Sequence, residues 1–474
     1  MAGKPGSKSP RGPVPTDKVR QLRRRLYVAA KRSPGRRFHA LFDRIHRSDV
    51  LWEAWRRVRR NKGSAGVDAQ TLAEVESYGV DRFVEEIGAE LRAGRYRPRA
   101  VLRRYIPKAD GKKRPLGIPT VGDRVVQMAA TLVLEPIFEA DFLPCSYGFR
   151  PMRRAHDAVA EVRHFTSRTY EWVVEGDIKA CFDEISHPAL LGRVRARVGD
   201  KRVLALVKAF LKAGILGEDH VLRETGAGTP QGSILSPLLS NVALSVLDEY
   251  VAQAPGGPGA SRNDRLTRRR HGLPNYRLSR YADDWCLVVS GTKADAEALR
   301  EEIAGVLSTM GLRLSPEKTL ITHIDEGLDF LGWHIQRRRK RGTSRRYVYT
   351  YPSRKAVKAV TGKVKTRCRQ NLNLPLATLL RQLNPVLRGW TAYFRPGVSS
   401  IAFGYLRAFT WRQVVRWLRR KHRGITWKEL RRRFCINGWW PADGDVIMFN
   451  PGAVRTTRYR YRGTKIPSPW PSAA

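Results

Sequence analysis

Residues 277–289 read Arg-Leu-Ser-Arg-Tyr-Ala-Asp-Asp-Trp-Cys-Leu-Val-Val, an apolar, strand-like stretch interrupted by two adjacent carboxylates, Asp283 and Asp284. Ionised groups keep their charge in apolar surroundings only when a cation meets them. Carboxylate oxygens are ligands that suit Mg²⁺, so a divalent metal is the natural partner of this pair. The stretch therefore points to metal-dependent phosphoryl-transfer chemistry.

A third carboxylate is needed for a two-metal site, and Asp177 is the best candidate because it ends another strand-like stretch, residues 171–177. Successive residues of a flat strand point to opposite faces. Asp283 and Asp284 can therefore share a site only if the chain turns between them, which predicts a hairpin tip. We expect Asp283 to be the stronger ligand, and Asp177 to lie beside the hairpin so that two Mg²⁺ ions can bind.

The 474-residue chain has a formal net charge of +46, and this charge is unevenly distributed. Residues 1–66 carry 19 Lys and Arg against 4 Asp and Glu, residues 67–336 carry 37 against 36, and residues 337–474 carry 33 against 3. A nearly neutral centre that contains the aspartates thus lies between two cationic ends. Such ends predict a polyanionic partner, with binding that weakens as salt is added.

The remaining composition excludes several classes of protein. The five cysteines are far apart and include no Cys-x-x-Cys pair, so neither a zinc site nor a disulfide framework is indicated. No apolar run is long enough to span a bilayer, and the N-terminus lacks the apolar core of a secretory signal. We expect a reducing, cytoplasmic setting. Residues 252–275, rich in Pro, Gly and Arg, predict an irregular, flexible insertion.

Ordered sequence blocks between residue 22 and about residue 440 make the chain resemble a group II intron-encoded protein, a reverse transcriptase and maturase. The last block resembles the maturase domain of that family. The blocks are Asn61-Lys-Gly-Ser-Ala-Gly-Val-Asp68, Ile106-Pro-Lys108, Arg114-Pro-Leu-Gly-Ile-Pro-Thr120, Ser146-Tyr-Gly-Phe-Arg-Pro151, Gly176-Asp-Ile-Lys179, Thr229-Pro-Gln-Gly232, Ser236-Pro-Leu-Leu239, Arg280-Tyr-Ala-Asp-Asp284, Phe330-Leu-Gly332 and Leu387-Arg-Gly-Trp-Thr-Ala-Tyr-Phe394.

The resemblance implies an α+β protein with a right-hand polymerase fold, followed by an α-helical thumb and maturase domain. It predicts four parts. Residues 1–18 would be a disordered basic N-terminus, and residues 19–336 would form the fingers and the β-sheet palm. Residues 337–440 would form the RNA-binding thumb and maturase domain, and residues 441–474 a basic, aromatic tail that binds nucleic acid.

The resemblance also implies a role for each matching site residue. The metal ligands and catalytic residues would be Asp177, Asp283 and Asp284, with the backbone carbonyl of Ile178 as a further ligand. The residues that bind the incoming nucleotide would be Lys108, Arg114, Phe182 and Gln231. The residues that hold the primer end or RNA would be Phe330, Leu331, Gly332, Arg388, Trp390 and Tyr393, although most tryptophans of this region are better explained as core residues.

The implied reaction is the addition of deoxynucleotides to a 3′-hydroxyl on an RNA template, with two Mg²⁺ ions as cofactors and dNTPs as substrates. The implied partners are the group II intron RNA, the target DNA and an RNA/DNA primer–template, with no membrane; a homodimer stays open. The implied location is the cytoplasm of a bacterial-type cell, at the nucleoid. Residues 435–474 contain one cysteine and no histidine, so we expect no HNH endonuclease domain there.

Two alternatives remain at this stage. One is an RNA-binding splicing factor that has lost polymerase activity, which the complete set of three aspartates argues against. The other is a reverse transcriptase of a retron or a diversity-generating system. The Arg388-Gly-Trp390 block and the cationic C-terminal region argue against that second alternative.

Overall fold

A four-stranded antiparallel sheet forms the centre of the fold, with the strand order β6-β7-β3-β8. The computed structural model describes residues 15–107, 111, 113–370 and 372–470. The strands of the central sheet are β3 (Trp172–Gly176), β6 (Asn275–Tyr281), β7 (Asp284–Ser290) and β8 (Leu320–His323).

Helices cover both faces of this sheet because apolar residues occupy both faces of β3 and β7. Val174 and Leu287 pack with residues of α11 (Ser236–Gln253) and α13 (Lys293–Ser308) in the largest core. Val173 and Val288, on the opposite face, pack with α7 (Ala155–Thr166) in a second core. The central sheet is therefore rigidly held, and only its edges and strand ends are free to form a site.

The N-terminal region is a helical layer that supports a second sheet. Helices α1 and α3 pack against α6, which is buried along most of its length. The second sheet has the order β2-β1-β4-β5, and β1 and β2 form a hairpin. The elements are α1 (Pro15–Arg32), α2 (Phe42–Ile45), α3 (Ser48–Arg60), α4 (Leu72–Tyr78), α5 (Val80–Arg92), β1 (Val101–Pro107), β2 (Lys113–Ile118), α6 (Val121–Glu139), β4 (Ile215–Leu216) and β5 (Leu222–Arg223).

The helices between the sheets include one inside the segment expected to be an irregular insertion. Helix α12 (Arg262–Arg270) begins at a capping box formed by Ser261 and Asp264, a local signal that stabilises a helix start. The other helices here are α8 (Cys181–Glu184), α9 (His187–Arg197) and α10 (Lys201–Leu211). At the N-terminus, α1 already begins at Pro15, within the segment expected to be disordered, and residues 1–14 lie outside the described residues.

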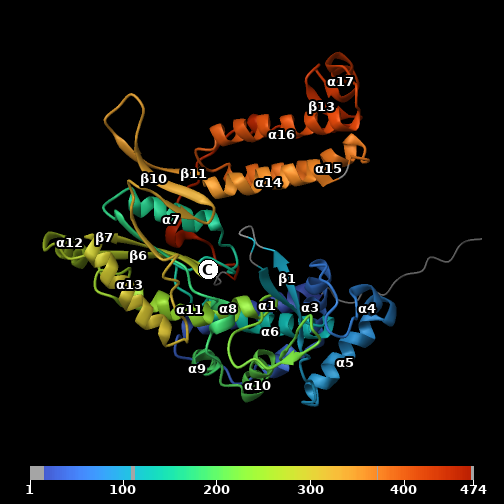
Figure 1. The fold of residues 1–474 in the computed structure, drawn as a ribbon. Coiled ribbons are helices and arrows are strands. Elements are labelled where there is room, and N and C mark those ends of the chain that lie inside the picture. The colour runs from blue at the N-terminus through green and yellow to red at the C-terminus, as the bar shows by residue number, and fades with distance from the viewer. Residues whose placement is uncertain (1–14, 108–110, 112, 371, 471–474) are drawn as a thin grey trace, which may run out of the picture.

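The C-terminal region is a helical arm with its own core. Figure 1 shows α14, α15 and α16 extending from the β10–β11 hairpin across the side on which β1 lies. Their apolar faces meet in a third core. The domain boundary expected between residues 336 and 337 falls inside strand β10. The elements are β9 (Leu328–Phe330), β10 (Trp333–Arg339), β11 (Arg346–Pro352), α14 (Arg354–Gln370), α15 (Leu376–Phe394), α16 (Ser400–Lys421), α17 (Trp427–Phe434), β12 (Cys435–Ile436), β13 (Trp440–Asp443), β14 (Val446–Ile447), η1 (Pro451–Ala453) and η2 (Gly463–Lys465).

The chain then returns to the central sheet as a C-terminal strap, defined here as residues 454–470. The strap leaves α15 near Arg395, whose carbonyl accepts a hydrogen bond from the Thr457 amide at 2.9 Å. The strap crosses α7, where Arg462 pairs with Asp157 at 2.7 Å. It ends at α1, where the ring of Trp470 lies 5.5 Å from that of Tyr27. The strap thus joins the arm, the central sheet and the N-terminal layer.

Candidate active site

Asp283 and Asp284 lie at the tip of the β6–β7 hairpin. The last residue pair of the hairpin is Tyr281 with Asp284, so Ala282 and Asp283 form a two-residue loop. Ala282 has φ +58°, a left-handed conformation that residues other than glycine rarely adopt. Asp283 is half-buried and Asp284 is exposed. The predicted hairpin is therefore confirmed and the two carboxylates have unequal surroundings, while the stronger binding by Asp283 stays a prediction.

Asp177 lies at the same edge of the sheet. Strand β3 ends at Gly176, which pairs with Trp285, so Asp177 follows one residue beyond, level with Asp284. This approach depends on glycine, because a Cβ at position 176 would lie 1.9 Å from the indole ring of Trp285. Asp177 accepts a hydrogen bond from the Lys318 ammonium at 2.8 Å. The strand register thus brings the three predicted carboxylates to one edge.

The carboxylates influence one another electrostatically. Burial raises the pKa of Asp283; the neighbouring Asp177 also raises it, and Arg114 opposes the shift. Burial among surrounding protein atoms, followed by Asp283 and Asp177, raises the pKa of Asp284 to about 6, even though part of its side chain is exposed. Burial is the largest cause of both shifts, so the ionised carboxylates are poorly solvated, and a bound divalent cation would favour their ionised form.

The donor set is chemically suited to Mg²⁺, which prefers carboxylate oxygens. Within the described part of the chain, however, no three His, Cys, Asp or Glu side chains are arranged to hold one ion. The bond from Lys318 occupies Oδ2 of Asp177, so a metal ion that binds this oxygen would compete with the ammonium. Ile178, the expected backbone ligand, is buried directly after Asp177 and bridges to Leu314.

Arg280 supports the hairpin tip through contacts that we did not predict. Its guanidinium is fully buried and forms an ion pair with Asp248 of α11, with Nε 2.7 Å from Oδ1. It also donates to the carbonyl of Ala282 and to the side chain of Asn241, each at 3.0 Å, and to the hydroxyl of Ser146 at 2.8 Å. One side chain therefore fixes the strained turn beside Asp283.

The segment before α7 closes the other side of this turn. Tyr147 donates its amide hydrogen to the carbonyl of Arg280 at 2.8 Å, and Asn241 donates to the carbonyl of Gly148 at 2.8 Å. A Cβ on Gly148 would lie 2.2 Å from the amide nitrogen of Ala282, so only glycine permits this contact. The motif Ser146-Tyr-Gly148 thus supports the hairpin tip, a role that the sequence alone did not reveal.

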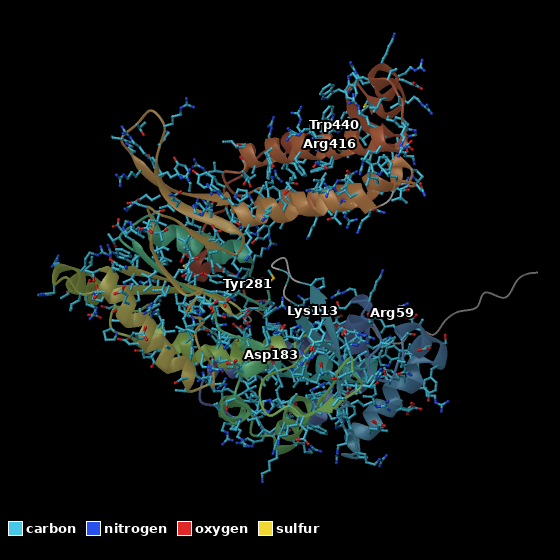
Figure 2. The ribbon with its side chains drawn as sticks, in the orientation of Figure 1. Arg59, Lys113, Asp183, Tyr281, Arg416 and Trp440 are labelled. Atoms are coloured by element: carbon cyan, nitrogen blue, oxygen red, sulfur yellow. The ribbon has the colours of Figure 1, made fainter. Side chains whose placement is uncertain are left out.

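Two of the residues predicted to bind nucleotide, Arg114 and Gln231, are joined by a hydrogen bond. The Nε of Arg114, in β2, donates to the side-chain oxygen of Gln231 at 3.0 Å, and Gly117 donates its amide hydrogen to the Gln231 carbonyl at 2.5 Å. The charge of Arg114 also lowers the pKa of Asp283, so the guanidinium lies within electrostatic reach of the aspartates. Lys108 lies outside the described residues. In Figure 2, Lys113 of the same hairpin and Tyr281 at the tip are labelled in the centre of the molecule.

Phe182 lies in α8, shortly after Asp177, and is 7% exposed. Its ring meets that of Phe149 edge-on, with centroids 6.5 Å apart. A cavity of about 690 Å³ borders Phe182 on the side of β1, β4 and β5, but its lining does not include the three aspartates. Phe182 therefore lines this cavity, and its contact with a nucleotide stays a prediction.

The segment expected to hold the primer packs against the block that resembles a maturase. Phe330 is buried, and Leu331 and Gly332 have positive φ values of +52° and +80°. The hydroxyl of Tyr393 donates to the Leu331 carbonyl at 2.8 Å, and the ring of Trp390 stacks obliquely on Phe394. Trp390 and Tyr393 thus have packing roles. The guanidinium of Arg388 lies 5.5 Å from the ring centroid of Phe449, and Arg388 is exposed.

Comparisons with known proteins match both halves of the chain. Residues 106–335 match the family described as "Reverse transcriptase (RNA-dependent DNA polymerase)", and residues 357–435 match "Group II intron, maturase-specific domain". A solved "Partial Cas6-RT-Cas1--Cas2 complex" is 22% identical, covers 55% of this chain and 41% of its own, and has a TM-score of 0.33, too low to carry an argument. No described helix is long and apolar enough to cross a membrane.

Two curated relatives are similar over most of this chain. Protein YkfC of Escherichia coli (strain K12) is 38% identical over 362 residues, which cover 71% of this chain and 93% of YkfC. The group II intron-encoded protein LtrA of Lactococcus lactis subsp. cremoris is 33% identical over 393 residues, 73% of this chain but only 62% of LtrA. The α+β fold has a reverse transcriptase part followed by a helical maturase part, as expected. The chain belongs to the family of group II intron reverse transcriptases and maturases.

Proposed function

We propose that this protein binds the RNA of its own group II intron, assists its splicing and copies it into DNA by target-primed reverse transcription during retrohoming. Residues 19–336 act as fingers and palm, and residues 337–440 act as the RNA-binding thumb and maturase domain. Residues 441–474 add further contacts to nucleic acid. The observation that supports the polymerase role best is the sheet register that brings Asp177, Asp283 and Asp284 to one edge.

In the proposed reaction, the 3′-hydroxyl of the primer attacks the α-phosphorus of a dNTP, the bond to the β-phosphate breaks, and pyrophosphate leaves. Two Mg²⁺ ions held by the three carboxylates and the carbonyl of Ile178 would stabilise charge on the attacking and leaving oxygens. Arg114 and Gln231, joined by a hydrogen bond beside Asp283, bind the triphosphate and orient it for in-line displacement. Lys108 shares this role.

The remaining residues of the site position these groups. Phe182 lies under the sugar of the incoming nucleotide, where its ring would clash with a 2′-hydroxyl. Phe330, Leu331 and Gly332 hold the primer end, supported by the bond from Tyr393 to Leu331. Arg388 is exposed and contacts RNA directly, whereas Trp390 and Tyr393 act on RNA through the surface that they shape.

Primer extension on an RNA template with Mg²⁺ tests the polymerase assignment. The variant Asp283→Asn removes one negative charge with little change in shape and should lower the extension rate by at least a hundredfold. Asp445→Asn, at an exposed position of the arm, makes the same chemical change and should leave the rate within twofold. Extension by Asp283→Asn at the wild-type rate would refute the role of Asp283.

Splicing of the intron RNA tests the maturase role separately. Asp283→Asn should still promote splicing of a transcript of the genomic segment that encloses the reading frame, because the maturase contacts do not use this carboxylate. A wild-type protein that promotes splicing but extends no primer would favour the splicing-only alternative. An enclosing segment without a group II ribozyme would favour a retron or a diversity-generating system.

A further inference from the structure

A groove of about 1060 Å³ opens between the C-terminal end of α7, the β10–β11 hairpin, the loop after α15 and the C-terminal strap. It is larger than most sites for small molecules, which enclose about 300–1,000 Å³. The lining contains six cations and no Asp or Glu side chain. The cations are Arg163, Arg168, Arg337, Lys340, Arg346 and Arg458.

Most of this positive charge lacks a negative partner. Arg337 and Arg346 share Asp325, with Nε of Arg337 2.6 Å and Nη1 of Arg346 3.5 Å from its carboxylate oxygens. The other four cations make no ion pair within the described residues. Since like charges at close range repel one another, this arrangement costs free energy until an anion enters.

Neighbouring cations contribute to lowered pKa values of two groups on α7. Burial, followed by the charge of Arg458, lowers the pKa of Arg163. Burial, followed by the charges of Arg168 and Arg163, lowers the pKa of His164 to about 4. A phosphate group would offset these repulsions because it brings negative charge and several hydrogen-bond acceptors.

The C-terminal strap builds one wall of the groove and is firmly attached to α7. The ring of Tyr461 stacks on His164 with centroids 4.2 Å apart, and Tyr459 stacks on His156 at 5.4 Å. Asp157 accepts hydrogen bonds from Arg462 at 2.7 and 2.8 Å. These contacts fix the strap after Arg458, and the bond from the Thr457 amide to the Arg395 carbonyl fixes it before Arg458. The groove is therefore preformed, so little ordering free energy is lost when it binds a ligand.

The groove and the three aspartates lie toward opposite ends of β3. Arg337, in the groove, forms an ion pair with Glu171, the residue before β3 begins. Asp177 follows the last residue of the same strand. Five residues of strand separate these ends by about 16 Å. The groove therefore lies apart from the carboxylate edge, and its lining includes none of the three aspartates.

We propose that this groove binds the sugar–phosphate backbone of the intron RNA at a site separate from the primer–template. The proposal rests on the proposed function, in which the protein binds its intron RNA. Tyr347, which is 43% exposed, and Tyr349 also line the groove and offer ring faces to unpaired bases. Folded RNA presents both backbone and splayed bases, which suits this combination of cations and aromatic rings.

The test compares two triple variants that lose the same charge. Arg168→Ala/Lys340→Ala/Arg458→Ala removes three unpaired cations from the groove. Arg262→Ala/Arg269→Ala/Arg270→Ala removes three cations from α12, none of which lines the groove. Binding of each protein to a transcript of the segment that encloses the reading frame is measured across a range of salt concentrations, and melting temperatures verify that both variants fold.

The groove variant should bind the transcript at least tenfold more weakly, and its slope of log affinity against log salt should fall by about 2 in magnitude. The α12 variant should stay within twofold of wild type. Equal effects of the two variants, or no effect of either, would overturn the groove assignment while wild-type binding upholds the proposed function. A wild type that fails to bind the transcript would overturn both.

Two further experiments identify the nucleic acid that binds in the groove without relying on variants alone. Photo-crosslinking of thiouridine-containing transcript to the wild type should label peptides that contain Tyr347 or Tyr461, and labels confined to α14–α17 would overturn the proposal. Binding of a DNA duplex is measured in parallel. A loss of DNA affinity in the groove variant, with RNA affinity unchanged, would assign the groove to DNA instead.

Discussion

Arg280 and Asp248 form an ion pair in which both side chains are 0% exposed, and the same guanidinium holds the carbonyl of Ala282 in the turn beside Asp283. The two residues come from different elements, strand β6 and helix α11. The pair therefore couples the position of a candidate metal ligand to the packing of α11 against the central sheet. Removing either partner should affect both the stability of the fold and the geometry of the site.

The substitution Asp248→Asn should destabilise the protein by about 3–5 kcal/mol, because a buried guanidinium would lose its compensating charge. The rate of primer extension should fall as well, since the turn that carries Asp283 loses its fixed anchor. Urea unfolding measures the free-energy change, and single-turnover extension at temperatures where the variant is folded measures the rate.

The double variant Arg280→Met/Asp248→Leu separates these two effects. Replacing a buried ion pair by apolar residues of similar size is often neutral or stabilising, so much of the stability should return. The rate should remain low, because Ala282 would still lack its hydrogen-bond donor. Full recovery of the rate in the double variant would show that Arg280 does not position the turn.

Gly176→Ala should destabilise the protein by about 1–3 kcal/mol and lower its activity, because the new methyl group would overlap the Trp285 ring and displace either the ring or the end of β3. Gly192→Ala is the matched control. No atom lies within 4 Å of a Cβ at this exposed position in α9, so alanine should stabilise the helix by about 0.5–1 kcal/mol. Thermal melting compares the two, and equal changes would contradict the steric explanation.

The hairpin tip was predictable from sequence because it follows from a local conflict. Two carboxylates in an apolar strand cannot share a site without a turn, and β6 and β7 place that turn at Ala282 and Asp283. Helix α12 also had a local signal, the Ser261 capping box, which the composition of residues 252–275 obscured. Short-range rules thus account for both elements, although only the hairpin tip was predicted.

Tertiary pairing was not predictable in the same way. Arg280 and Asp248 lie 32 residues apart, and nothing in either local sequence specifies that the guanidinium meets that carboxylate. The basic, aromatic tail was expected to bind nucleic acid, yet Tyr459, Tyr461 and Arg462 contact α7. Composition identifies side chains that can stack or form ion pairs, but the residue that each of them contacts depends on the packed fold.

Glu161, half-buried in α7, should make the stability of the protein depend on pH. Burial raises its pKa from 4.5 to about 7, and the hydrogen bond from Tyr147 opposes this shift. The folded state therefore binds a proton that the unfolded state releases between these values. The stabilising effect of the protonated group is complete below pH 4.5 and is lost as the pH rises through about 7.

The variant Glu161→Gln should mimic the protonated acid. Its free energy of unfolding should match that of wild type at pH 4.5 and exceed it by up to about 2–3 kcal/mol at pH 8. Urea unfolding at both pH values tests this. A variant that is less stable than wild type at pH 8 would show that the ionised carboxylate is stabilised by Arg277 and Arg153 more than burial disfavours it.

The ion pair between Lys318 and Asp177 predicts competition between an ammonium group and Mg²⁺ for the same carboxylate. A ligand that binds only the folded state raises its stability by about 2.7 kcal/mol at 100 times its Kd, so melting temperature reports metal binding. Wild type should melt at higher temperature as Mg²⁺ is added. Asp177→Asn/Asp283→Asn should not respond, because two of the three carboxylates are neutralised.

Lys318→Met should reach its half-maximal rise in melting temperature at a lower Mg²⁺ concentration than wild type, because the metal no longer displaces an ammonium from Asp177. Lys293→Met is the matched control: it removes the same charge from an exposed ion pair with Glu297 on α13, outside the carboxylate edge. It should leave the Mg²⁺ response unchanged. A Lys318→Met variant that needs more Mg²⁺ than wild type would contradict this competition. It would show instead that Lys318 stabilises the metal-bound protein through its ion pair with Asp177.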